Sequence, residues 1–270
     1  MTSETLNVLT TETTATCNNN NNMKTLSGAI MALVGLLLSS SVATQAQTFR
    51  QKPVTRSCVK LGKDHVEPKY YREGACYAQE QIIDIIKDLV TVTTEAFEAN
   101  DVTYFLDSGT LLGAFRDGKV IPHDVDADLG IDARGLTYLQ QNLVVFPDEY
   151  ELNIWNSYLD PNSTRDDKLP VRVVHKESGL YLDVFAFLDW TDEENGAQMV
   201  GPLPSWCMFN CDSCPVAPTG GKTLRVPKDW IYPLIACPFE GATKKCPAQT
   251  EKYLKYVFGA DFRKPVKYTY

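Results

Sequence analysis

Residues 124–132 hold four aspartates in nine positions and are the segment of this sequence best suited to chemistry. Acidic residues or glycine alternate with apolar ones, and this period of two predicts a strand whose apolar side chains face the core. The carboxylates then share the opposite face at spacings of roughly 6.5–7 Å, where their charges repel one another. A hard divalent cation such as Mg²⁺ or Mn²⁺ converts that repulsion into binding. The metal ligands predicted on this face are Asp124, Asp126 and Asp128.

Two other interpretations of these aspartates involve no catalysis. They can mark an exposed edge strand, whose charges deter aggregation with other chains. They can also suggest an EF-hand calcium loop, but its invariant glycine would fall at Leu129 and its closing glutamate at Gly135. The spacing therefore excludes the EF-hand and leaves the edge strand as an alternative.

A Gly-Thr pair upstream of the aspartates is suited to binding phosphate. Gly109-Thr110 is expected at a junction between a strand and a helix, where outward-pointing N–H groups cradle a phosphate. Arg116, one turn further on, could add a charged fork to the same phosphate. Each signal is weak alone, but the aspartates that follow make the combination much stronger.

A site for two cations needs a third carboxylate, and Asp183 is the best candidate. It is a lone acid within the apolar run 181–185, and such an acid is seldom buried without a partner. The alternative is a core aspartate that forms a salt bridge with Arg172 across a hairpin.

The elements that must position these residues follow from the apolar periodicity. We predict helices over 77–99, 111–116, 135–145 and 249–258, and strands over 102–106, 125–131, 150–156, 171–176 and 181–188. The last two strands should form a hairpin, and from residue 201 a Cys- and Pro-rich segment should wrap the core. Helices mixed with hairpin strands predict an α+β fold with a mixed sheet flanked by helices.

The N-terminal residues predict export. Residues 1–22 are polar and read as a disordered or mispredicted extension, and residues 23–46 have the pattern of a signal peptide. A retained signal anchor is the minority alternative, because the apolar run is short for a membrane span; only in that case would the protein be bound to a membrane. Residues 47–76 form a loop-rich lead-in, 77–262 the folded domain and 263–270 a tail.

Cysteine usage fits the lumen of the endoplasmic reticulum or Golgi, or the outside of the cell. Seven cysteines follow the signal segment, and most should form disulfides in an oxidising compartment. Zinc binding by the cluster at 207–214 is the less favoured alternative. Asn162 begins a glycosylation sequon, which agrees with export. The disulfide candidates are Cys58, Cys76, Cys207, Cys211, Cys214, Cys237 and Cys246.

Overall charge argues against one class of partner. The formal net charge is −8 at pH 7, whereas binding to a nucleic-acid backbone depends on lysine and arginine. We therefore expect no nucleic acid as a partner, although phosphate can still bind locally where a cation supplies the charge.

Several motifs resemble the LicD family, which includes fukutin and fukutin-related protein. The likeness is most specific in 109–116 and 120–131, and it extends to 230–234 and to Pro-Phe-Glu-Gly at 238–241. Matches at Pro247, Tyr253-Leu254 and Phe258-Gly259 complete it, so that the resemblance covers about residues 77–262. His123 departs from the family, which usually has tryptophan there.

The resemblance implies a nucleotidyltransferase fold of the DNA polymerase β type. Carried over by position, Asp126 and Asp128 are the metal-binding pair, Asp183 is the third carboxylate, and Gly109-Thr110 is the phosphate turn. It further implies a metal-dependent transfer of a phosphocholine- or phosphoribitol-like group from a CDP-activated donor to a hydroxyl of a glycan or glycoprotein. In this mechanism nucleoside monophosphate leaves, and Asp183 could accept the hydroxyl proton.

Two other functions remain open. An Asp-x-Asp glycosyltransferase would use a sugar-nucleotide and release nucleoside diphosphate. A secreted family member without catalysis would bind glycan or cation and turn over no nucleotide.

Overall fold

The computed structural model describes residues 58–156, 169–203 and 224–265, all of which lie within one compact unit, Pro53–Tyr270. The extension 1–22, the signal segment 23–46, Asn162 and the cysteines at 207, 211 and 214 lie outside the described residues, so these assignments stay predictions. In the part of the chain that is described, no helix is both long and apolar enough to span a membrane.

The described residues form five α-helices and eleven strands. The helices are α1 (Gln79–Ala99), α2 (Ser108–Asp117), α3 (Ala133–Gln141), α4 (Lys228–Ile231) and α5 (Thr250–Phe258), with short 3-10 turns at Lys63–His65 and Pro68–Tyr70. The strands are β1 (Cys58–Lys60), β2 (Cys76–Ala78), β3 (Tyr104–Leu106), β4 (Ala127–Asp132), β5 (Tyr150–Ile154), β6 (Val171–His175), β7 (Tyr181–Thr191), β8 (Gln198–Leu203), β9 (Val226–Pro227), β10 (Ile235–Phe239) and β11 (Ala242–Cys246).

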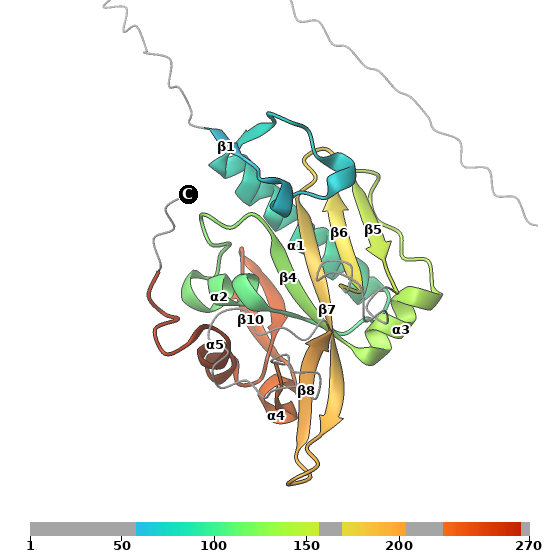
Figure 1. Cartoon of the computed structure of the whole chain (residues 1–270), viewed down its shortest axis with the longest axis vertical. Coiled ribbons are helices and arrows are strands. Elements are labelled where there is room, and N and C mark those ends of the chain that lie inside the picture. The colour runs from blue at the N-terminus through green and yellow to red at the C-terminus, as the bar shows by residue number, and fades with distance from the viewer. Residues whose placement is uncertain (1–57, 157–168, 204–223, 266–270) are drawn as a thin grey trace, which may run out of the picture. The chain divides into compact units, whose positions relative to one another are not determined.

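One mixed sheet organises the fold (Figure 1). Its strand order is β3-β4-β7-β6-β5, in which β4 and β7 are parallel and the other neighbours are antiparallel. The same seven-stranded sheet includes β8, which pairs with the second half of the long strand β7, and β9, which pairs with β8. The predicted α+β class with a mixed sheet is therefore confirmed.

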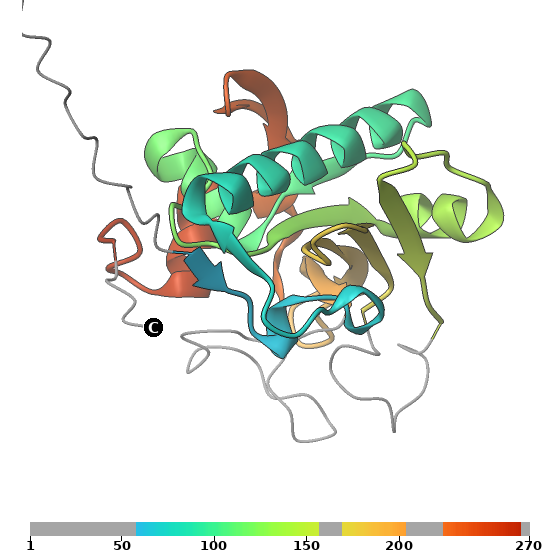
Figure 2. The same ribbon diagram turned by 90° about the horizontal axis from the view of Figure 1, so that it is seen from above.

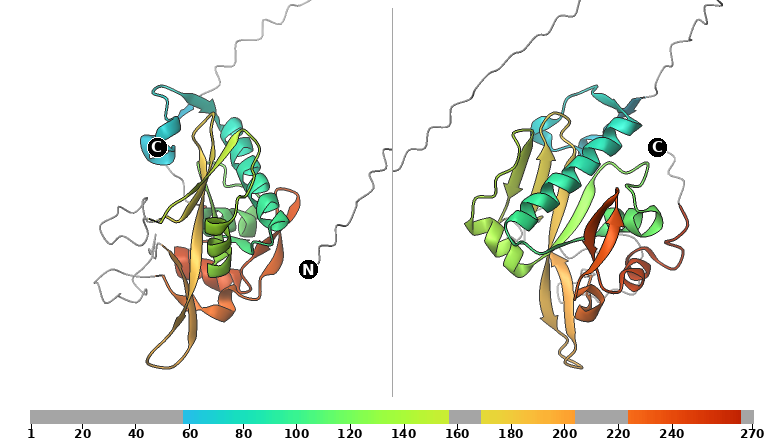
Figure 3. Two further views of the ribbon diagram at one scale, coloured as in Figure 1. Left: turned by 90° about the vertical axis from the view of Figure 1, so that its right-hand side faces the viewer. Right: turned by 180° about the vertical axis from the view of Figure 1, so that it is seen from behind.

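Helix α1 lies across one face of this sheet (Figures 2 and 3). Its apolar residues recur at helical spacing, and the resulting stripe is buried against the sheet. The predicted stripe of Ile82, Ile86, Leu89, Val90 and Phe97 is confirmed, since each of these side chains is at most 1% exposed. The helix is capped by Gln81, whose side chain accepts a hydrogen bond from the Ala78 N–H.

Two elements begin or end at other residues than the sequence predicted, because contacts with other elements determine their boundaries. The strand expected at 125–131 begins two residues later, because β7 pairs with Ala127 and the residues after it. The helix expected at 135–145 covers Ala133–Gln141, because Asp132 accepts a hydrogen bond from Gly135 N and caps its start. The expected hairpin of β6 and β7 is confirmed.

The Cys- and Pro-rich segment from residue 201 ends in the predicted helix, α5, but it also contains a strand pair that the sequence analysis did not predict. Strand β10 pairs with β11 in a regular hairpin, and α4 and α5 flank it. Cys237 and Pro238 within β10 hid the strand pattern, because they interrupt the alternation of apolar and polar residues.

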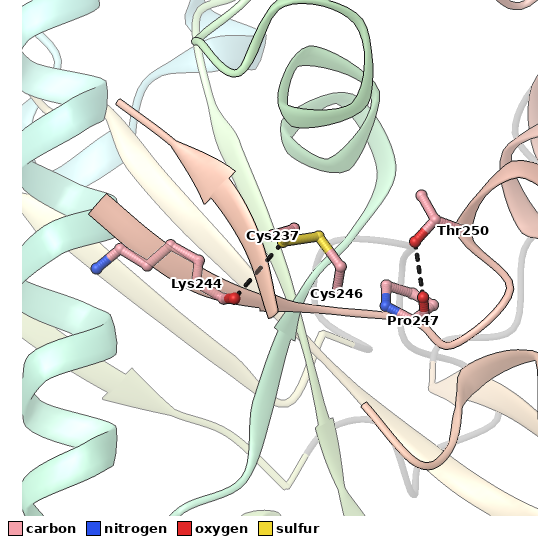
Figure 4. Close-up of a disulfide and its surroundings, with 5 residues drawn as sticks. All are labelled: Cys237, Lys244, Cys246, Pro247 and Thr250. Carbon is pink, nitrogen blue, oxygen red and sulfur yellow. Dashed lines mark hydrogen bonds between the residues drawn. A yellow bond between two sulfur atoms is a disulfide. The ribbon is translucent and has the colours of Figure 1, made fainter. Parts of the chain in front are cut away.

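Two disulfides reinforce the ends of the described chain. Cys58–Cys76 joins β1 to β2, and Cys237–Cys246 joins β10 to β11. Figure 4 shows the second bond, with Cys237 Sγ lying 3.6 Å from the carbonyl oxygen of Lys244. All four predicted disulfide cysteines within the described ranges are therefore paired.

Removing the Cys237–Cys246 disulfide is expected to weaken the C-terminal hairpin. Its cysteines are separated by 9 positions, and constraining a loop of that size stabilises a fold by about 2.5 kcal/mol in the chain-entropy description. The double variant Cys237→Ser/Cys246→Ser should lower the free energy of unfolding by that amount in urea titrations. An unchanged midpoint would contradict this expectation.

Candidate functional site

Strands β4 and β7 bring the central aspartates together. Asp128 on β4 lies in parallel register beside Asp183 on β7. The backbone N–H of Asp128 donates a hydrogen bond of 2.8 Å to Thr110 Oγ1 at the start of α2. The N–H of Asp107, at the end of β3, donates to the carbonyl oxygen of Asp128 at 3.1 Å. One end of the sheet thus unites residues far apart in the sequence.

The prediction that all the carboxylates share one strand face is wrong. Asp124 and Asp126 precede β4 and lie in the loop that enters it, so of the three predicted metal ligands in this segment only Asp128 belongs to the paired strand. The first residue of β4 that pairs with β7 is Ala127, which lies opposite Leu182. The loop nevertheless keeps Asp124 close to the start of α2.

Gly109 provides the space for this arrangement. A Cβ atom placed on Gly109 would lie 2.9 Å from Asp124 Oδ2 and 3.9 Å from Asp128 Oδ2. The preceding residue, Ser108, has φ 44°, a left-handed conformation that a residue other than glycine rarely adopts. The chain therefore turns sharply from β3 into α2 directly against the aspartates.

The predicted phosphate-binding residues are only partly brought together. Gly109 and Thr110 lie in the first turn of α2, where backbone N–H groups have no partner within the helix. The Thr110 side chain is buried and accepts the Asp128 N–H, so it fastens α2 to β4. Arg116 lies in the last turn of α2, about 9 Å along the helix axis from Thr110.

Asp183 forms the salt bridge that the sequence left as an alternative. Arg172 on β6 donates from Nε to Asp183 Oδ1 at 2.6 Å and from Nη2 to Oδ2 at 3.1 Å. Arg172 Nη1 also donates to Glu67 Oε2 at 3.1 Å, and the guanidinium lies 3.7 Å from the centre of the Tyr181 ring. Asp183 is thus both the neighbour of Asp128 and the partner of Arg172.

Sequence reasoning missed Asp107 and Tyr253 as parts of this site. The Tyr253 hydroxyl, on α5, donates a 2.7 Å hydrogen bond to Asp107 Oδ1, and both residues are buried. The position of Asp107 at the end of an apolar strand, just before Gly109-Thr110, was the available signal for the aspartate. Nothing in the local sequence connects it to Tyr253.

Five aspartates form what we call the acidic cluster: Asp107, Asp124, Asp126, Asp128 and Asp183. Burial and the charges of the other four raise the pKa of Asp128 well above its usual range. Burial and the neighbouring charge of Asp126 raise the pKa of Asp124 to about 8. Burial raises the pKa of Asp107 to about 6, although the Tyr253 hydroxyl opposes the shift.

The acidic cluster fits a hard divalent cation in charge and donor type. Carboxylate oxygens are the ligands that Mg²⁺ and Mn²⁺ prefer, and a cation would relieve the repulsion around Asp128. Over the described ranges, however, no three His, Cys, Asp or Glu side chains already stand in an arrangement that could hold a metal ion. An ionised carboxylate has about four acceptor positions, and the bonds from Arg172 to Asp183 use two of them.

The metal-free protein is expected to lose stability as the pH rises. A carboxyl group with a raised folded pKa stabilises the fold below its unfolded pKa, and this contribution is lost as the pH rises through the folded pKa. For Asp107 and Asp124 that loss falls between about pH 4 and pH 8. Mg²⁺ should therefore raise the melting temperature more at about pH 8 than at about pH 5, as calorimetry can measure.

Asp124→Asn is the control for this pH dependence. It removes one titrating group, so its metal-free melting temperature should change less between the two pH values than that of the parent protein. Equal Mg²⁺ shifts at both pH values would contradict the electrostatic explanation.

The chain is a mixed α/β protein with an acidic site at one end of its sheet. It belongs to the LicD family, because the family described as LicD/FKTN/FKRP, nucleotidyltransferase domain, matches residues 101–249. Asp107, Asp124, Asp126, Asp128 and Asp183 all lie within the matched segment.

Three relatives show how far the similarity extends. The ribitol 5-phosphate transferase FKRP of Mus musculus is 26% identical over 199 residues, 71% of this chain and 34% of the relative. The Homo sapiens protein of the same name is 26% identical over 181 residues, 64% of this chain and 31% of the relative. An uncharacterized protein of Rickettsia prowazekii is 35% identical over 95 residues, 35% of each chain. The chain thus spans about a third of the length of these relatives.

Proposed function

We propose that this protein is a metal-dependent phosphotransferase. It transfers a phospho-alcohol group, such as phosphoribitol or phosphocholine, from a CDP-activated donor to a glycan hydroxyl. The observation that carries the proposal is the parallel register of Asp128 and Asp183, with the start of α2 against Asp128, inside the segment that defines the family. The relatives named as ribitol 5-phosphate transferases support the phospho-alcohol class.

The proposed roles follow from the position of each group. Asp126 and Asp128, with Asp124 beside them, would hold Mg²⁺ or Mn²⁺, and the cation would offset the charge of the donor diphosphate. Backbone N–H groups at the start of α2, in Gly109 and Thr110, favour a phosphate oxygen, because the positive end of the helix dipole adds to their hydrogen bonds.

Asp183 is the proposed acceptor of the proton from the attacking hydroxyl. The new bond joins this hydroxyl oxygen to the donor phosphorus, and the bond from that phosphorus to the CMP oxygen breaks. Arg172 donates to both oxygens of Asp183, which fixes the orientation of the carboxylate.

The proposed location is the secretory pathway, in the lumen of the endoplasmic reticulum or Golgi or outside the cell. The disulfides Cys58–Cys76 and Cys237–Cys246 support it, because such bonds persist in oxidising compartments. The pattern of a signal peptide at 23–46 points the same way.

A second candidate function is glycan or cation binding without catalysis. The bidentate bond from Arg172 to Asp183 favours it, because a carboxylate engaged in this way serves the fold as a structural partner. This candidate predicts that no donor is cleaved.

Incubation of the purified protein with a panel of donors separates these functions. The panel contains CDP-ribitol, CDP-choline and UDP- and GDP-linked sugars, each with Mg²⁺ or Mn²⁺ and a glycan acceptor. Release of CMP supports the proposal, and release of nucleoside diphosphate indicates an Asp-x-Asp glycosyltransferase instead. If no donor is consumed, the non-catalytic candidate replaces the proposal.

A further inference from the structure

The turn between β10 and β11 contains an unusual residue for its geometry. Phe239 pairs with Ala242, so Glu240 and Gly241 are the two turn residues, with φ of 49° and 79°. Two positive φ values are typical of a type I′ turn, where asparagine or aspartate before glycine is strongly preferred. A glutamate held in this conformation points to a role beyond making the turn.

Both the backbone and the side chain of Glu240 contact the segment that follows α2. Its N–H donates to the Gly118 carbonyl oxygen at 2.8 Å, and its Oε1 accepts the Val120 N–H at 2.8 Å. Its Oε2 forms a salt bridge of 3.2 Å with Lys87 Nζ on α1. One residue therefore ties the hairpin to α1 and to the exit of α2.

The fastened segment leads directly into the acidic cluster. Gly118 ends α2 in a left-handed conformation with φ 66°, and Val120 precedes Asp124 by only four residues. A Cβ atom on Gly118 would lie 3.8 Å from the Pro238 carbonyl oxygen, so the hairpin packs close to this turn. The loop with Asp124 and Asp126 is thus held by the hairpin at its first residues and by β4 at its end.

We propose that Glu240 is a positioning residue for this loop. We call the turn Phe239-Glu240-Gly241-Ala242, with its hydrogen bonds to Gly118 and Val120, the clasp. The clasp restrains the loop against the mutual repulsion of its aspartates, so that Asp124 and Asp126 stay where a cation can bind them. The part that concerns cation binding rests on the proposed function.

The hairpin is rigid enough to act in this way. The Cys237–Cys246 disulfide cross-links its two strands at the end away from the turn (Figure 4). Lys244 Nζ donates a 2.6 Å hydrogen bond to Thr94 Oγ1, which ties β11 to the buried face of α1. The clasp therefore fixes the start of the loop relative to α1 and to the hairpin.

Glu240→Asp provides the sharpest test. Aspartate suits the type I′ turn better than glutamate, but its shorter side chain cannot reach the Val120 N–H. If Glu240 only shapes the turn, this variant should equal or exceed the parent protein. If the clasp acts as proposed, the melting temperature should hold while amide exchange across residues 119–126 becomes about tenfold faster. The affinity for Mn²⁺, from calorimetric titration, should weaken about tenfold.

Two matched variants separate the hydrogen bond from the charge. Glu240→Gln keeps an oxygen for the Val120 N–H. Lys87→Ala leaves Glu240 in place and removes its salt bridge, together with the longer contact from Lys87 to Asp84. Both should retain slow exchange in 119–126 and native affinity for Mn²⁺. Rescue by glutamine would show that the acceptor atom matters rather than the overall charge.

Three results would overturn the clasp. These are unchanged exchange in Glu240→Asp, equal damage in Glu240→Gln, and a Val120 amide in the parent protein that exchanges as fast as an exposed one. The last measurement needs no variant, so it decides the matter even if Glu240→Asp fails to fold. Absence of Mn²⁺ binding to the parent protein would count against the proposed function, while the exchange data would still decide on the clasp.

Discussion

Asp128→Asn is expected to lower donor turnover by roughly a thousandfold or more while stabilising the metal-free protein. Asp128 lies among the other members of the acidic cluster. It is a proposed ligand of the cation, and asparagine in its place lacks the charge that binds the cation. Loss of several kcal/mol of charge stabilisation in the transition state corresponds to that factor in rate. The same change removes a buried like charge, and each kcal/mol of relieved repulsion raises the melting temperature by about 2–4 °C.

Asp132→Asn is the matched control for Asp128→Asn. Asp132 lies on the same strand but at its other end, where it caps α3, and asparagine caps helices well. Turnover and melting temperature of this control should stay close to those of the parent protein. Substantial turnover by Asp128→Asn, or a lower melting temperature without metal, would show that Asp128 is a structural residue.

Arg172→Met is expected to destabilise the fold by about 3–5 kcal/mol, because it removes one partner of a buried ion pair. Arg172 is 6% exposed and Asp183 8%, and the change would leave Asp183 and Glu67 without the guanidinium. Asp183 would also remain beside Asp128 with its charge uncompensated. Urea titration monitored by circular dichroism measures the loss.

The double variant Arg172→Met/Asp183→Asn tests the cause of this loss. Removing the orphaned carboxylate should restore a large part of the stability, since the penalty comes mainly from the unpaired charge. A loss that stays the same in the double variant would instead assign the effect to the contact between Arg172 and the Tyr181 ring.

Much of the core followed from the sequence, because periodicity reports directly on burial. The apolar stripe of α1 recurs on one face of the helix, whereas the nearly continuous apolar runs of β6 and β7 are buried at consecutive positions. Strand β10 was not predicted, because Cys237 and Pro238 stand where residues typical of a strand would be expected. Its pairing with β11 depends on a local turn and a disulfide.

The candidate site divides in the same way. Asp126, Asp128 and Asp183 could be selected from composition and spacing, and the family match places them in one domain. Arg172 was foreseen as a partner of Asp183, but its hold on both carboxylate oxygens and on Glu67 required the register of β6 and β7. The Thr110 hydroxyl accepts a hydrogen bond from the backbone of β4, and this contact between two elements was not predicted from the sequence.

The amino-acid sequence alone determined the class of fold, the family and the aspartates that give this protein its acidic site. Only the tertiary structure decided that Asp107 meets Tyr253, that Asp183 bonds Arg172 and that Glu240 fastens the loop before Asp124. The physical reason is the distance along the sequence over which each kind of information acts. Side-chain periodicity and motif spacing act within one element, whereas these contacts join residues from different elements. They form only when sheet register and helix packing bring the chain segments within hydrogen-bonding distance.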